Sequence, residues 1–95
     1  GGKARLLAGT SGPDMVELWQ WSLNPGEMFT SPGHGEGTTE LLFVTEGALT
    51  LTVNDGVYLI REGNSAVART DAPHSYANVG DKIARFTMTV SEKAR

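Results

Sequence analysis

Apolar residues occur along this chain in short runs, and each run ends at glycine, proline, asparagine or aspartate. In the last run Phe86, Met88 and Val90 alternate with polar residues, which is the pattern of a half-buried strand. No window keeps the period of about 3.6 residues that marks an amphipathic helix. The pattern therefore predicts an all-β chain with almost no helix.

Eight strands follow from these runs and from the turn signals between them. We expect them at residues 4–10, 15–23, 40–46, 49–53, 57–60, 65–70, 74–79 and 83–90, with a polar tail at 91–95. Asn54-Asp55-Gly56 is a hairpin signal, and Gly47 is expected to act as a hinge between two strands. Apolar residues occupy both odd and even positions of the second strand, so we expect both of its faces to be covered. Many short strands in this order predict a sandwich, a barrel or a jelly roll.

The chain has 95 residues, no cysteine and a formal net charge of -3. We interpret residues 1–95 as a single domain. Lysine and arginine do not cluster, so we expect no direct contact of this domain with nucleic acid. Without a signal peptide or an apolar run of about 18 residues, we expect a cytoplasmic protein with no membrane partner. The chain begins Gly1-Gly2 instead of with methionine, which we interpret as a sign of excision from a longer protein.

The candidate chemistry lies in two segments, each built around one of the two histidines. In the first, His34 is followed by Glu36, by Glu40 and, after a mostly apolar run, by Gly47. Written as spacing, this is H-x-E-x3-E-x6-G, and the nearest glycine of the preceding turn is Gly26. We expect the fold to bring both histidine segments together around one pocket.

The second segment follows an equally regular spacing. It runs from Gly63 through Arg69 and Asp71 to His74 and Asn78, which is G-x5-R-x-D-x2-H-x3-N.

These two patterns resemble the signature motifs of the cupins, G-x5-H-x-H-x3/4-E-x6-G and G-x5-P-x-G-x2-H-x3-N. Glu36 stands where the first motif has its second histidine, and its leading glycine is displaced. Arg69 and Asp71 replace the proline and second glycine of the second motif. The resemblance covers residues 24–90 and implies a cupin-type double-stranded β-helix, which is a jelly-roll barrel.

The resemblance also implies that His34, Glu40 and His74 bind one divalent metal. Imidazole and carboxylate donors suit zinc, iron, nickel or manganese. Donor atoms that share a metal lie roughly 3–4 Å apart, whereas His34 and Glu40 would be about 20 Å apart along an extended strand. We therefore expect this segment to loop back on itself, which its alternating glycines permit.

Four further residues are candidates for ligand binding, each with a structural alternative. Tyr76 orients a ligand, or it is a core tyrosine with a satisfied hydroxyl. Trp21 stacks on a ligand, or like Trp19 it belongs to the core or a dimer surface. Glu36 is a fourth metal ligand or a solvated loop residue, and Asn78 contacts a ligand or holds a turn. We assign no catalytic residue, because the sequence offers no Ser/His or Cys/His pair and no phosphate loop.

The sequences of the two motifs are similar to those of the cupin domains that follow a helix-turn-helix domain in bacterial XRE-type transcriptional regulators. That likeness implies a sensor domain for a small-molecule ligand, with DNA bound through the attached domain. The alternative is a small metal-dependent cupin enzyme of dioxygenase or isomerase type, and a storage cupin ranks below both. We also expect a homodimer in which Trp19 and Trp21 anchor the interface.

Overall fold

The computed structural model describes residues 2–93. In this part of the chain there are nine strands and no helix, hence no helix long and apolar enough to cross a membrane. Eight of the nine are the strands expected from the pattern. The strands are β1 (Lys3–Gly9), β2 (Met15–Leu23), β3 (Met28–Ser31), β4 (Thr39–Glu46), β5 (Ala48–Val53), β6 (Gly56–Arg61), β7 (Ser65–Arg69), β8 (His74–Ala77) and β9 (Ala84–Glu92).

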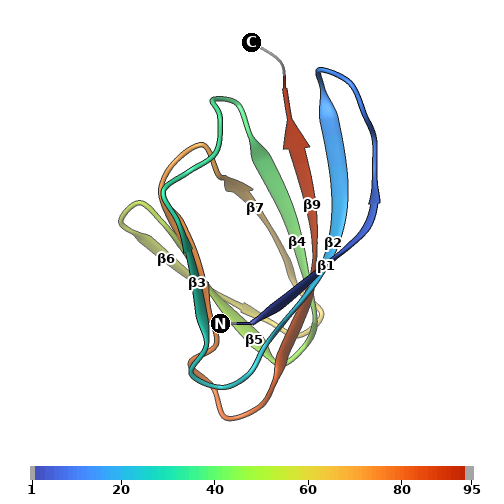
Figure 1. Ribbon diagram of the computed structural model, residues 1–95. Coiled ribbons are helices and arrows are strands. Elements are labelled where there is room, and N and C mark those ends of the chain that lie inside the picture. The colour runs from blue at the N-terminus through green and yellow to red at the C-terminus, as the bar shows by residue number, and fades with distance from the viewer. Residues whose placement is uncertain (1, 94–95) are drawn as a thin grey trace.

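The strands form two antiparallel sheets that face each other across the core (Figure 1). One sheet has the order β1-β2-β9-β4-β7 and the other the order β3-β8-β5-β6. The chain crosses between the sheets repeatedly, so neighbours within a sheet are mostly distant in sequence. This arrangement is the jelly-roll barrel predicted from the sequence.

One strand, β3, is absent from the sequence prediction. It has only four residues between two proline-containing turns, and it owes its strand conformation to pairing with β8, where Phe29 lies opposite Tyr76. The prediction was also wrong at the C-terminal end, because β9 continues to Glu92 into the expected polar tail. Residues 94–95 of that tail lie outside the described residues.

The core consists of the inward-facing residues of both sheets, which alternate with outward-facing ones along each strand. Its members are Leu23, Leu42, Val44, Leu49, Leu51, Ile60, Ala68, Tyr76, Phe86, Met88 and Val90.

The structure bears on two expectations for β2, and it corrects the second. Trp19 and Trp21 point inward and pack against the core, and the Trp21 ring stacks on Phe86 with 5.9 Å between centroids. The structure thus places both side chains against the core, which was the structural alternative to a dimer surface. The opposite face of the strand is not covered in this structure, since Val16 and Leu18 are exposed. Alternate residues of a strand point to opposite faces, and only the odd-numbered face of β2 meets the other sheet.

Gly47 has the hinge position expected of it, between β4 and β5. Its φ of 74° lies in the left-handed region, and a Cβ there would stand 2.3 Å from the carbonyl oxygen of Ile83. Only glycine fits this close approach of two backbones.

Candidate metal and ligand site

A cavity of about 140 Å³ opens between the two sheets. We call it the His–Glu cavity. It is lined by Glu17, Trp19, Trp21, His34, Glu40, His74, Tyr76, Met88, Val90 and Glu92. The cavity contains the three expected metal ligands and two of the four expected ligand-binding residues, Trp21 and Tyr76.

Three potential donors converge in the His–Glu cavity. His34, Glu40 and His74 each offer one atom, and these atoms all lie within 4.8 Å of one another. The His34 Nε2 atom is 3.4 Å from Glu40 Oε2, and the two imidazole centroids are 5.3 Å apart. His34 and His74 meet because the loop after β3 follows the pairing of Ser31 with His74, and Glu40 on β4 faces them from the other sheet.

The orientation of His74 gives the most direct indication of an occupant. The residue is only 3% exposed, and its Nδ1 lies 2.8 Å from the carbonyl oxygen of Ala72. A carbonyl only accepts, so Nδ1 carries a proton, and in the neutral ring the lone pair is then on Nε2. That Nε2 is buried and has no hydrogen-bond partner among the described residues. Such a backbone bond behind an imidazole is the usual support of a metal-binding histidine.

Glu40 places a carboxylate deep in the same cavity, where it is 1% exposed. The Tyr76 hydroxyl donates a hydrogen bond to Glu40 Oε1, which leaves Oε2 on the side of His34. Burial, followed by the nearby negative charge of Glu40, raises the pKa of Tyr76 above its ordinary range, so the hydroxyl remains a donor. A buried carboxylate is costly unless it is paired or coordinates a metal, and the two imidazoles supply the remaining donors for that purpose.

His34 reaches the cavity because the β3–β4 loop folds back on itself, as the sequence analysis predicted. Gly33 has a φ of 117°, and a Cβ on it would stand 3.1 Å from the Ala72 carbonyl carbon. The His34 amide donates to the Thr70 carbonyl at 2.8 Å. The loop therefore lies directly against the turn that precedes His74 (Figure 1).

Asp71 holds the far side of the same loop. Its Oδ2 accepts a hydrogen bond from the Gly37 amide at 3.0 Å, and Arg69 lies 3.7 Å from it. These contacts, the Gly37 amide first, lower the pKa of Asp71. Asp71 thus positions the loop that carries His34, a role that the sequence did not indicate.

Two expected site residues are not brought into the cavity. Glu36 is exposed in the β3–β4 loop and does not line it. Asn78 is buried elsewhere, and its Nδ2 donates to the carbonyl oxygens of Leu23 and Lys82, while its Oδ1 accepts from the Gly80 amide. All polar atoms of the Asn78 side chain are therefore used in holding the turn after β8, which was the structural alternative.

The cavity also contains residues that the sequence analysis missed. Glu17 shares the inward face of β2 with both tryptophans, so its odd-numbered position was a usable signal. Glu92 lies in the part of β9 that was interpreted as a tail, so no comparable signal existed.

Comparisons with known proteins agree with this architecture. The sequence profile of the family described as "Cupin domain" matches residues 19–90. Comparison with curated proteins found no match. Among solved structures, the cupin domain of an XRE family transcriptional regulator from Enterobacter cloacae is similar, with a TM-score of 0.75 and 21% identity over 79% of each chain.

Two further structures extend this comparison. An HTH_3 family transcriptional regulator from Vibrio cholerae has a TM-score of 0.76 and 25% identity, covering 81% of this chain but only 43% of that regulator. The present chain thus spans less than half of its length. The Cnp3 cupin domain from Schizosaccharomyces pombe has a TM-score of 0.82 and 15% identity over 97% of this chain and 65% of that one.

Proposed function

Because this chain belongs to the cupin domain family, we propose that it is the sensor domain of a cytoplasmic transcriptional regulator. In this proposal the His–Glu cavity binds a divalent metal and a small polar or zwitterionic metabolite. The observation that carries the proposal is the buried, unpartnered Nε2 of His74 beside His34 and Glu40. Three donors within 4.8 Å of one another fit a metal.

The metal is zinc, iron, nickel or manganese, held by His34, Glu40 and His74. Three protein ligands leave coordination positions open, and there a ligand oxygen or nitrogen would bind. Tyr76 orients the Glu40 carboxylate through its hydrogen bond.

The ligand is a small molecule, since about 140 Å³ is well below the roughly 300–1,000 Å³ of pockets for drug-sized compounds. The walls are aromatic and apolar, with Trp21, Tyr76 and Met88 among them. The Trp21 Nε1 atom is buried and has no partner within residues 2–93, so a ligand that offers it a hydrogen-bond acceptor gains affinity.

DNA recognition would belong to an attached helix-turn-helix domain. The net charge of -3 offers this domain no basic face for phosphates. Both bacterial structures named above come from transcriptional regulators, and the one from Vibrio cholerae has more than half of its length beyond the matched region.

The ligand signal would pass through the β3–β4 loop. This loop carries His34 at the cavity and rests on the turn before His74 through Thr70 and Asp71. A ligand changes the packing of attached domains only if it binds one loop arrangement more tightly than the other. Metal and metabolite both touch His34 in this proposal, so both bias that arrangement.

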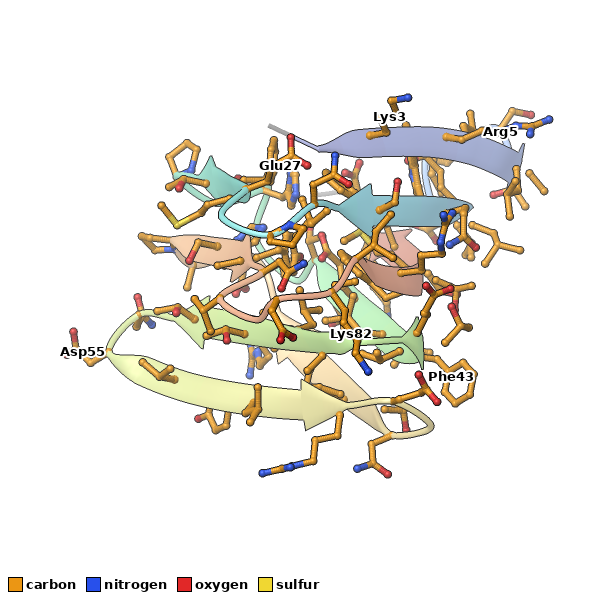
Figure 2. All side chains as sticks on the ribbon, turned by 90° about the horizontal axis from the view of Figure 1, so that it is seen from below. Lys3, Arg5, Glu27, Phe43, Asp55 and Lys82 are labelled. Carbon is orange, nitrogen blue, oxygen red and sulfur yellow. The ribbon has the colours of Figure 1, made fainter. Side chains whose placement is uncertain are left out.

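The homodimer remains a prediction, and we now place its interface on the outer face of the five-stranded sheet. Leu18 on β2, Leu41 and Phe43 on β4 and Val67 on β7 are exposed on strands of this sheet, and Figure 2 shows Phe43 projecting away from the ribbon. Phe43→Asp should give monomers in light scattering at tens of micromolar, whereas Val57→Asp on the other sheet should leave the dimer intact. A wild-type monomer under these conditions contradicts the prediction.

The decisive experiment uses the full-length gene product. Operator DNA binding is measured with and without metal and candidate metabolites, for the wild type and for His74→Ala. We expect a metabolite to shift operator affinity in the wild type only. A gene product that lacks a DNA-binding domain and turns over a metabolite would instead favour the metal-dependent enzyme.

A further inference from the structure

We propose that the mouth of the His–Glu cavity binds the positively charged end of its ligand, an organic ammonium group, at Glu17, Glu92 and the Trp19 ring. This inference rests on the proposed function, because it names the chemical class of the metabolite. It follows from the residues that β2 and β9 contribute to the lining of the cavity, and not from similarity to another protein.

Glu17 and Glu92 lie on neighbouring antiparallel strands and face the same way. Glu17 pairs with Val90, and Glu92 pairs with Met15, so the two glutamates are offset by two residues in the register. Diagonal neighbours of this kind are about 7–8 Å apart at the backbone, close enough for both carboxylates to reach one cation. Both residues are partly buried and line the cavity.

The charges of the cavity are unbalanced. Its lining contains the carboxylates of Glu17, Glu40 and Glu92, whereas no lysine or arginine is present in that described lining. A divalent metal at the inner end would neutralise two of these three negative charges and would still leave the lining with one in excess. Two carboxylates at this spacing repel each other, and a bound cation offsets that repulsion.

Trp19 prepares the site further. Its Nε1 donates to Glu17 Oε1 at 3.2 Å, which holds this carboxylate beside the indole. The other oxygen of Glu17 can then accept a hydrogen bond from an ammonium group while the indole face attracts the same charge.

Independent evidence that this acidic pair belongs to a ligand site comes from the inner end. The His74 side chain is 3% exposed, lines the same cavity and leaves Nε2 unpartnered. The cavity is therefore built for an occupant along its length. A ligand with a metal-binding group at one end and an ammonium group at the Glu17 end is a small amine-bearing acid or a related amino compound.

The test compares β-alanine, propionate and propylamine, which are matched in size and differ in charge. Their binding to the zinc-loaded full chain is measured by ligand-observed NMR and by quenching of tryptophan fluorescence. We expect β-alanine to bind at least about tenfold more tightly than propionate, because both offer a carboxylate to the metal end and only β-alanine adds a charge-assisted hydrogen bond. The double substitution Glu17→Gln with Glu92→Gln should remove that preference. The matched control, Glu46→Gln with Glu62→Gln, removes two charges outside the cavity and should keep it.

Three results would overturn the inference: propionate binding as tightly as β-alanine, no binding of either amine, or a full preference for β-alanine over propionate in the folded Glu17/Glu92 variant. Urea unfolding checks that the Glu17/Glu92 double variant is folded. Zinc titration of the wild type tests the proposed metal site separately. Zinc uptake without amine preference rejects only this inference, whereas amine preference in protein that takes up no zinc supports it and rejects the metal.

Discussion

Two openings between the strands of residues 2–93 differ in size and chemistry. The His–Glu cavity is about 140 Å³ and is lined by strands β2, β4, β8 and β9 together with His34. The second opening, which we call the β6–β7 groove, is about 440 Å³. It is lined by Leu51, Val53, Tyr58, Leu59, Ile60, Ser65, Ala66, Val67, Ala68 and Arg69.

The larger opening has fewer unsatisfied buried polar atoms in its lining. Three buried side-chain nitrogen or oxygen atoms have no partner among residues 2–93, and none of them lies in the lining of the β6–β7 groove. Two of the three, Trp21 Nε1 and His74 Nε2, lie in the lining of the His–Glu cavity. Native proteins satisfy nearly all buried polar groups, so unsatisfied ones identify a binding site better than volume does. The comparison assigns binding to the small opening and fold stability to the large one.

The largest effect that separates the two openings is expected from His74→Ala. This change removes a metal donor and should abolish stoichiometric zinc uptake, measured by metal analysis and isothermal titration. The control Glu36→Ala changes a residue near His34 that does not line the cavity, and most of the uptake should survive. Stoichiometric zinc in His74→Ala would remove the distinction between the openings.

Leu51→Ala tests the opposite opening. Leu51 is 2% exposed, and truncating a buried leucine lowers the free energy of unfolding by about 2–5 kcal/mol. Urea unfolding measures this, with Leu59→Ala as the control, because Leu59 lines the same groove but is 54% exposed. Zinc affinity of the folded variant should be unchanged. A parallel loss of zinc would mean that the two openings are coupled.

Tyr76→Phe tests the support of the buried carboxylate. Without the hydroxyl, Glu40 Oε1 loses its donor, and we expect the unfolding free energy at neutral pH to fall by about 1–3 kcal/mol. The matched control is Tyr58→Phe in the β6–β7 groove, where no such change is expected.

The same variant makes a prediction about alkaline pH. Because the folded-state pKa of Tyr76 is raised above the ordinary 10.0, the folded protein keeps a proton that the unfolded chain releases. This stabilisation is complete below pH 10 and is progressively lost as pH rises further. Above pH 10, urea unfolding should show that the stability of the wild type falls as pH rises. This fall should be smaller in Tyr76→Phe and as large as in the wild type in Tyr58→Phe. Equal slopes in all three proteins would contradict the assignment.

The smallest effect is expected from Asp71→Ala, which releases the Gly37 amide and loosens the loop that carries His34. Loss of such an outer contact weakens metal binding by about tenfold. Isothermal titration with zinc measures it. Asp55→Ala at the tip of the β5–β6 hairpin, labelled in Figure 2, is the control and should bind zinc as the wild type does. Identical affinities would show that the loop needs no support from Asp71.

Much of the fold was readable from local pattern. Eight strands follow from short apolar runs between turn residues, and Gly47 and the Asn54-Asp55-Gly56 turn lie where their residue types indicated. Strand β3 was not readable, because its four residues carry little pattern and only their partner β8 makes them a strand. Propensity is weak in such a short segment, and tertiary pairing decides its conformation.

The site residues likewise fall into those that the sequence indicated and those that only the structure revealed. The sequence by itself showed two motifs that resemble those of the cupins, and this resemblance implied that His34, Glu40 and His74 are candidates for one centre. Only the tertiary structure decided that Glu17 and Glu92 share the cavity, that Asn78 does not, and that Asp71 holds the loop. The physical reason is that the chain alternates between two sheets. A side chain's neighbours are then set by strand order and register, which a single strand's sequence does not contain.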